Sequence, residues 1–312
     1  MSDWPQLMPF FRARRGGRFA LVTLAAKGGS SYRPVGARLL VADDGAHAGS
    51  LSGGCLEDEV AAEAVRVLAS GKRRIHEIDT RPHFGCPGRL TLVIEPLPEG
   101  WLASLDERLA RRATFWVSTG HADEAAGPGS VLHDQPPAAT KGCFVETVGP
   151  AKRVVVVSGT SDADHVVRLG ELLGWEMRRV LPAGDRAGPG DGARDEVCLP
   201  EEVVRRFAPD AGTAVVVMTH HLARDLHYLR AVLPEAYSYV GLLGSARRRE
   251  QLLGELGETG VLADDSVAGR LHAPVGLDLG ATDPASVALA IVAEIQAAWT
   301  GRSGARLRES RR

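Results

Sequence analysis

The sequence is poor in cysteine, and its few cysteines lie far apart. Among 312 residues there are four, at Cys55, Cys86, Cys143 and Cys198, and no two of them form a CxxC pair. Disulfide frameworks occur mainly in short secreted domains, and a structural zinc site needs closely spaced cysteines. The pattern therefore favours reduced thiols in a cytoplasmic protein and argues against both a disulfide scaffold and a zinc ribbon.

Long apolar runs and an excess of one charge are also missing. The longest apolar stretches, residues 214–218 and 287–293, are much shorter than the roughly 20 residues of a membrane-spanning helix. The N-terminal residues 1–19 lack the apolar core of a secretion signal. The formal net charge is −2, whereas a protein built around a nucleic-acid backbone usually has a basic excess. We therefore expect a protein that binds neither membranes nor nucleic acids.

The composition that remains is that of a folded protein with two domains. Hydrophobic residues make up 44% and charged residues 24% of the chain, which are ordinary globular values. The length suggests about two domains, each large enough to bury a core. The pair Gly149-Pro150 marks a linker, so the sequence predicts domains over residues 1–149 and 150–312.

The first domain shows strand patterns and one clear helix. Val60, Ala64, Val67 and Leu68 recur at helical spacing. Glycine, proline and alanine dominate residues 120–139, which predicts a loop. The predicted elements are helices 58–69 and 102–112 and strands 19–25, 38–41, 73–78, 90–95, 114–118 and 142–148. A small α/β domain is expected.

The second domain alternates apolar strands with amphipathic helices. Asp283 and Pro284 are typical of a helix N-terminus, and they place the start of the last helix. The predicted elements are strands 154–157, 177–181, 214–218 and 237–242 and helices 164–173, 201–207, 223–232, 246–256 and 284–299. This alternation predicts an α/β fold with a doubly wound parallel sheet, similar to a Rossmann domain.

Ser52, Gly53, Gly54 and Cys55 form a glycine-rich turn that opens helix 58–69. Glycines let a ligand approach the backbone, and free N–H groups at a helix start attract anions. The helix dipole would also favour the thiolate of Cys55. A tight turn with a buried thiol would use the same residues, so both interpretations stay open.

Two further loops of the first domain carry candidate ligand groups. Residues 28–36 combine backbone donors, hydroxyls and Arg33, which suit a phosphate, although a hairpin loop has the same composition. Cys86 follows Gly85 in a second loop, where a thiol can ligate a soft metal or carry sulfur. We expect Cys143 and Cys198 to be ordinary structural cysteines.

The first strand of the second domain is followed by an altered nucleotide-binding turn. Ser158, Thr160 and Ala163 stand where a dinucleotide fingerprint has glycines, and no acid follows the second strand. Without those glycines the backbone is less able to approach a pyrophosphate. The pattern therefore argues against NAD as a cofactor.

Two other strand ends of this domain carry polar groups. His220 and His221 follow strand 214–218, where they would contact a phosphate, bind a metal or shuttle a proton, or else belong to a capping cluster with Asp225. Gly241, Gly244 and Ser245 precede a basic helix start over residues 247–249. Cations oppose the dipole there unless an anion is present, so the turn is either an anion cradle or a solvated basic face.

Taken together, these motifs resemble the XdhC/CoxI family of xanthine dehydrogenase accessory factors. The resemblance extends over most of the chain, and the motifs follow one another in the family's order. The matching segments are residues 28–36, 49–57, 85–86, 94–96, 219–221 with Asp225, 239–245, 273–280, Pro284 and 293–295. The family's glycine-rich turn after the first Rossmann strand is replaced by residues 158–163, and its glycine after Cys86 by Pro87.

The resemblance implies a maturation factor rather than an enzyme. It implies a small α/β domain followed by a Rossmann-like domain, in a cytoplasmic homodimer. It also implies binding of the molybdenum cofactor (molybdopterin), protection of that cofactor and delivery to a molybdenum hydroxylase such as xanthine dehydrogenase. A cysteine desulfurase that adds the terminal sulfido ligand is the second implied partner.

With this family in view, the sequence predicts a set of cofactor contacts. The residues are Arg33, Ser52, Gly53, Gly54, Cys55, Cys86, His220, Gly241, Gly244 and Ser245. Cys55 is expected at the molybdenum, with Cys86 as the second thiol. Two alternatives stay open: an NAD(P)-dependent oxidoreductase that uses the second domain, and a metal-binding or regulatory module with His220 and His221 as ligands.

Overall fold

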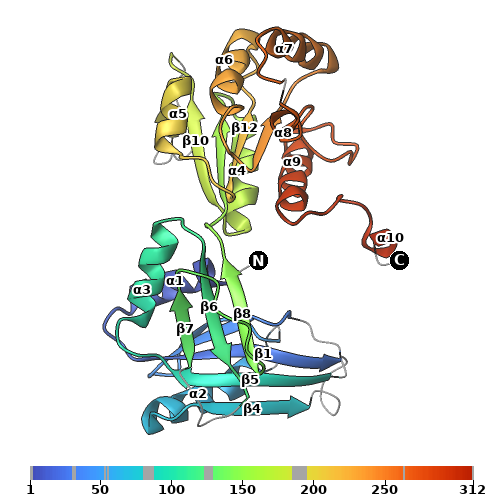
Figure 1. The fold of residues 1–312 in the computed structure, drawn as a ribbon. Helices are drawn as coiled ribbons and strands as arrows, with labels where there is room; N and C mark the ends of the chain where they lie inside the picture. The colour runs from blue at the N-terminus through green and yellow to red at the C-terminus, as the bar shows by residue number, and fades with distance from the viewer. Residues whose placement is uncertain are drawn as a thin grey trace. The chain divides into compact units, whose positions relative to one another are not determined.

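The computed structural model describes residues 3–29, 33–52, 54, 56–79, 88–122, 129–184, 195–262 and 264–310. The chain divides into two compact units, Met1–Gly149 with two β-sheets and Pro150–Arg312 with one (Figure 1). No helix in the described ranges is both long and apolar enough to cross a membrane.

The N-terminal unit contains two antiparallel sheets. The larger sheet has the strand order β3-β2-β1-β5-β4 and the smaller one β7-β6-β8. The strands are β1 (Phe19–Gly29), β2 (Arg38–Ala42), β3 (His47–Gly49), β4 (Arg74–Asp79), β5 (Gly88–Pro96), β6 (Phe115–Gly120), β7 (Ser130–His133) and β8 (Cys143–Val148). The helices are α1 (Trp4–Ala13), α2 (Glu57–Ser70) and α3 (Trp101–Ala110).

Alternation along β1 divides the core of this unit between the two faces of the larger sheet. Ala20, Val22 and Leu24 pack in one cluster with the apolar side chains of α2. Phe19 and Leu21 belong to a second cluster, which contains side chains of α1, α3 and the smaller sheet. Successive side chains of a strand point to opposite faces, so one fully apolar strand supports two layers. As a result, α2 covers one face, with its N-terminus beside the turn after β3.

The C-terminal unit is built on six parallel strands in the order β11-β10-β9-β12-β13-β14. They are β9 (Arg153–Val157), β10 (Glu176–Leu181), β11 (Asp195–Val197), β12 (Thr213–Val217), β13 (Tyr239–Leu242) and β14 (Leu271–His272). The helices are α4 (Asp162–Leu172), α5 (Pro200–Arg206), α6 (Leu222–Val232), α7 (Ala246–Glu258), α8 (Asp265–Ala268), α9 (Pro284–Trp299) and α10 (Leu307–Ser310). This is the strand order of a Rossmann domain, which confirms the predicted fold class.

Both faces of the parallel sheet are covered by helices (Figure 1). Val155 and Val157 of β9 pack with side chains of α5, α6 and α7. Val154 and Val156 pack with side chains of α4 and α9. Burial on both faces explains why these strands read as continuous apolar runs. The strand order reverses between β9 and β12, and ligands in such folds bind beyond the carboxyl ends of the strands at that point.

Three elements of the N-terminal unit, β3, β7 and α1, are absent from the sequence prediction. The sequence predicts a loop throughout residues 120–139, but Ser130–His133 forms β7. The backbone N–H and hydroxyl of Ser130 donate to the buried carboxylate of Glu95, at 2.7 and 2.6 Å, and this long-range contact anchors the strand. Helix α1 contains Pro5 and Pro9, and because proline is unfavourable inside a helix, the sequence did not indicate one here.

Candidate functional site

A single carboxylate organises the turn that precedes α2. Glu57 is the first residue of the helix, and it is only 7% exposed. Its two oxygens accept the backbone N–H groups of four nearby residues and the hydroxyls of two serines. The donors are the amides of Leu51 (2.8 Å), Ser52 (2.9 Å), Gly54 (2.9 Å) and Leu56 (3.1 Å) and the hydroxyls of Ser50 (3.1 Å) and Ser52 (2.9 Å).

This network changes the interpretation of the glycine-rich turn. One of the two interpretations of the sequence expects free N–H groups that bind an external anion, but in the structure the Glu57 carboxylate already accepts hydrogen bonds from four of them. Gly54 has a backbone φ of +113°, a conformation that residues other than glycine rarely adopt. Gly53 and Cys55 lie outside the described residues. The backbone N–H groups of Gly54 and Leu56, the two chain neighbours of Cys55, both donate to the Glu57 carboxylate. Hydrogen bonds therefore fix the backbone on either side of the cysteine.

The hydrogen bonds to Glu57 make the N-terminal unit sensitive to acid. Burial alone would raise the pKa of this carboxyl, but hydrogen bonds from Ser52, Leu51 and Leu56 hold the pKa far below its usual range. A group whose pKa is lower in the folded chain binds fewer protons there, so stability rises with pH. Its contribution is present above the unfolded pKa of about 4.3 and is lost as the pH falls toward the folded value.

We therefore expect a pH-dependent difference between the wild type and Glu57→Gln. The wild type should be the more stable at neutral pH, and its advantage should shrink as the pH falls below about 4. Urea unfolding of both proteins across this range measures the difference directly. A gap that stays constant down to the lowest pH would contradict the role given to the ionised carboxylate.

The N-terminal unit has two other predicted cofactor contacts, Arg33 and Cys86. The Arg33 guanidinium forms an ion pair with Asp3 at 2.7 Å, so an external phosphate would have to share it with a carboxylate. Cys86 lies outside the described residues. The predicted contacts of the N-terminal unit that the structure places together are therefore Ser52 and Gly54, on the turn fixed by Glu57.

The C-terminal unit has a cleft of about 470 Å³ beyond the carboxyl end of β12, beside the first turns of α4 and α9. It brings together three residues that the sequence singled out, His220, Gly244 and Ser245. Two carboxylates also line it, those of Asp162 and Asp283. Its walls are apolar and come mainly from Val166, Met218, Leu243, Val287, Ala288 and Ile291. A cleft with apolar walls and a few polar groups is typical of a small-molecule site.

Gly241 has a packing role rather than a place in this cleft. It is buried within β13, and a Cβ atom there would lie 2.6 Å from the side chain of Val275. Glycine is therefore required because the segment after β14 packs directly against the strand. The prediction that Gly241 contacts a ligand has no support in this geometry, since it does not line the cleft.

The basic start of α7 is compensated from within the protein. Asp225 on α6 is completely buried, and its carboxylate forms an ion pair with the guanidinium of Arg248. The same carboxylate accepts the backbone N–H (3.1 Å) and the hydroxyl (2.6 Å) of Thr219. Of the two interpretations left open by the sequence, the anion cradle needs an external anion, and the structure provides Asp225 instead. Ser245 caps the helix through a hydrogen bond from the Arg248 backbone N–H at 3.4 Å.

His220 is held in a strained conformation at the mouth of the cleft. Its φ of +58° makes it one of two non-glycine residues with positive φ in the described part of the chain. The neighbouring Thr219 is fixed by Asp225, and the N–H of His221 donates to the Thr219 hydroxyl at 3.2 Å. The imidazole is 43% exposed, with Nε2 3.6 Å from the carboxylate of Asp162. Strain of this kind is characteristic of functional positions.

A metal site built by side chains alone has less support. Among the described residues no group of three or more His, Cys, Asp or Glu side chains could hold a metal ion. His220 and Asp162 are a pair, and His221 contacts Thr219 through its backbone. The cleft therefore suits a ligand recognised by hydrogen bonds and apolar contact better than a bare cation.

In the turn after β9, backbone groups are already hydrogen-bonded to other groups of the protein. The Ser158 hydroxyl accepts the Thr160 N–H at 3.1 Å, and the buried Arg179 donates to the carbonyls of Ser158 (3.3 Å) and Thr160 (3.0 Å). Asp162 adds a negative charge at the first turn of α4. A dinucleotide would need free N–H groups and a neutral or positive helix start at this place.

We therefore expect NADH not to bind this chain. Repulsion by Asp162 and the occupied N–H of Thr160 both disfavour a diphosphate at the turn. A fluorescence titration with NADH should show no saturable increase. A saturable signal that NAD⁺ displaces and that Asp162→Asn strengthens would show that the turn binds nucleotide after all.

Family models match both units of the chain. Residues 12–79 match the model described as the XdhC and CoxI family, and residues 154–295 match the XdhC Rossmann domain. The chain belongs to the XdhC/CoxI family. The matched segments of this XdhC-type chain contain the Glu57 turn, the strained His220 and the cleft beside it.

Relatives of this XdhC-type chain match nearly its full length. The molybdenum cofactor insertion chaperone PaoD of Escherichia coli K12 is 27% identical over 283 residues, which cover 88% of this chain and 81% of that protein. A protein of Bacillus subtilis 168, described as a probable subunit of xanthine dehydrogenase, is 23% identical, with 88% and 91% covered. A solved structure described as a xanthine dehydrogenase from Bacillus halodurans has a TM-score of 0.73 and 22% identity, over 97% of both chains, and so shares the fold.

Proposed function

We propose that this chain is a maturation chaperone for the molybdenum cofactor. It binds the cofactor, protects it and delivers it to a molybdenum hydroxylase of the xanthine dehydrogenase type, and a cysteine desulfurase adds the terminal sulfido ligand while the cofactor is bound. Similarity to a named cofactor insertion chaperone over 88% of the chain supports this function. The family resemblance favours a homodimer in the cytoplasm.

The observation that carries the proposal is the turn before α2. Gly54 and Leu56 are tied to one buried carboxylate, and Cys55 lies between them in the sequence. A thiol that must meet a metal needs a backbone that does not move when the cargo arrives or leaves. Thiolates are soft ligands, and we assign the molybdenum side of the cofactor to Cys55, with Cys86 as the second thiol.

Considered by itself, the cleft of the C-terminal unit fits a pterin ring better than a phosphate. Asp162 and Asp283 make the cleft acidic, and the one cation among the described residues of its lining, Arg248, is paired with Asp225. A phosphate would be repelled there, whereas the N–H groups along the edge of a pterin can donate to carboxylates. We assign this edge to Asp162 and His220, with Gly244 and Ser245 beside it and the apolar walls against the flat ring.

Transfer to a client tests this function. The chain is incubated with molybdenum cofactor, freed of excess by gel filtration, and mixed with cofactor-free xanthine dehydrogenase. The expected result is a regain of hydroxylase activity in proportion to the molybdenum carried by the chain, and no regain with a chain that was never loaded. A chain that retains no molybdenum, or that retains it without any transfer, would contradict the proposed function.

A further inference from the structure

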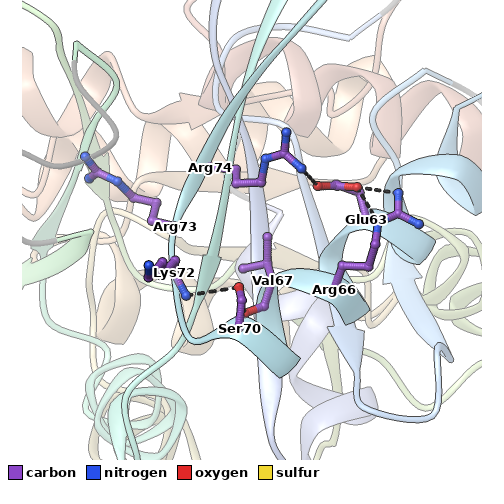
Figure 2. Close-up of a pocket in the computed structure, with 7 residues that line it drawn as sticks. All are labelled: Glu63, Arg66, Val67, Ser70, Lys72, Arg73 and Arg74. Carbon is purple, nitrogen blue, oxygen red and sulfur yellow. Dashed lines mark hydrogen bonds and ion pairs between the residues drawn. The ribbon is translucent and has the colours of Figure 1, made fainter.

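A second pocket, separate from the Glu57 turn, lies where the C-terminal half of α2 meets β4 (Figure 2). It has a volume of about 690 Å³, and the residues that line it are Glu63, Arg66, Val67, Ser70, Lys72, Arg73 and Arg74. Four of these side chains are cationic and one is anionic. The whole chain has a net charge of −2, so positive charge is concentrated at this pocket.

Glu63 holds two of the four cations in place. Its carboxylate is largely buried, accepts the Nε–H of Arg66 at 2.7 Å and forms a second ion pair with Arg74. The side chains of Arg66 and Arg74 remain 67% and 55% exposed, so each guanidinium is fixed on one side and open to solvent on the other. The free edge of each guanidinium can pair with a second carboxylate.

The cations surround the pocket and do not converge on one point. Figure 2 shows Arg73 and Arg74 directed to opposite sides, while Arg66 approaches Glu63 from α2. Lys72 is exposed and follows Gly71, the left-handed residue that ends the helix. The carbonyl end of a helix disfavours a compact anion beside it, and a phosphate would also have to compete with Glu63 for both guanidinium groups.

We infer that this pocket docks an acidic polypeptide segment of a protein partner. Carboxylates spaced along a peptide can reach several of the four cations at once, which a single compact anion cannot do. The inference needs the proposed function only to explain why a partner is present, since delivery of a cargo requires contact with its recipient. Binding of an acidic peptide can be measured with neither cofactor nor client, so the two proposals fail separately.

The test uses the full chain and a fluorescein-labelled oligoglutamate peptide, with anisotropy read at low and physiological salt. Wild type should bind, and salt should weaken the complex. Lys72→Glu/Arg74→Glu should bind about tenfold more weakly or worse. The control Arg306→Glu/Arg308→Glu, which changes the net charge by the same amount at an exposed site of the other unit, should bind like wild type.

For a third variant, the expected change in affinity for the peptide is an increase. Glu63→Gln removes the internal competitor of Arg66 and Arg74, so this variant should bind the peptide more tightly than wild type. Equal weakening in both double variants would overturn the proposal, because binding would then follow net charge alone. Displacement of the peptide by inorganic phosphate beyond the effect of chloride at equal ionic strength would also overturn it, by identifying a compact-anion site. Unchanged or weaker binding by a folded Glu63→Gln protein would do the same.

Discussion

Glu57→Ala is expected to destabilise the N-terminal unit by about 3 kcal/mol and to abolish retention of the cofactor. The substitution leaves the backbone N–H groups of Leu51, Ser52 and Gly54 without their acceptor, and the Leu56 N–H keeps only the Ser52 hydroxyl at 3.1 Å. Each buried donor left unpaired is costly. The turn beside Cys55 then loses its fixed conformation. Urea unfolding gives the stability, and molybdenum analysis after gel filtration gives the retention.

Glu59→Ala is the matched control for this prediction. Glu59 lies in the same first turn of α2 and is exposed, so its loss removes the same charge from the helix N-terminus without touching the network. It should change stability by less than about 1 kcal/mol and leave retention intact. If both variants behaved alike, the effect would belong to the helix dipole, and the hydrogen-bond network would have no special part.

Asp225→Ala is expected to destabilise the C-terminal unit by about 3–5 kcal/mol. The substitution leaves the Arg248 guanidinium without its counter-ion and the Thr219 N–H without its acceptor. Asp225 and Thr219 are buried, and the Arg248 side chain is only 17% exposed. The restraint on the segment that holds His220 at positive φ is lost at the same time. We expect the cleft to lose its shape and the chain to carry less cofactor.

The double variant Asp225→Leu/Arg248→Met separates charge burial from packing. Replacing both partners of a buried ion pair by apolar groups is often close to neutral, whereas removing one partner is not. The double variant should therefore be much more stable than Asp225→Ala in urea unfolding, although it still lacks the hydrogen bonds to Thr219. A double variant as unstable as the single one would show that Asp225 acts through Thr219 alone.

The four inner strands of the parallel sheet could be predicted from the sequence, whereas the short edge strands β11 and β14 could not. Strands buried on both faces give short, fully apolar runs, and these alternate with helices along the chain. Helix α9 begins at Pro284, as Asp283 and Pro284 predicted, because the side chain of Asp283 accepts the N–H groups of the first turn. In contrast, β7 depends on Glu95, which is distant in the sequence, and no local pattern indicates it.

The candidate site was predicted in part. The sequence identified the turns that contain Ser52, Gly54 and Gly244, because glycines at a helix start indicate a need for an anion. It did not indicate that Glu57 supplies the anion at the first turn. Asp225 was considered only as part of a capping cluster with His220 and His221, and its ion pair with Arg248 was not indicated. For Glu57 a signal was available: a carboxylate directly after a glycine-rich turn is placed to accept its N–H groups. Asp225 meets Arg248 only through the packing of α6 against α7.

The central claim is that Cys55, on the turn fixed by Glu57, binds the molybdenum cofactor. Cofactor retention in cysteine variants tests this claim most directly. Wild type, Cys55→Ala and Cys143→Ala are each incubated with molybdenum cofactor and passed through gel filtration, and molybdenum and pterin are measured in the protein peak. Cys143 is a half-buried residue of β8 and serves as the control. We predict that wild type and Cys143→Ala retain the cofactor and that Cys55→Ala retains little. Equal molybdenum in all three proteins would contradict the claim.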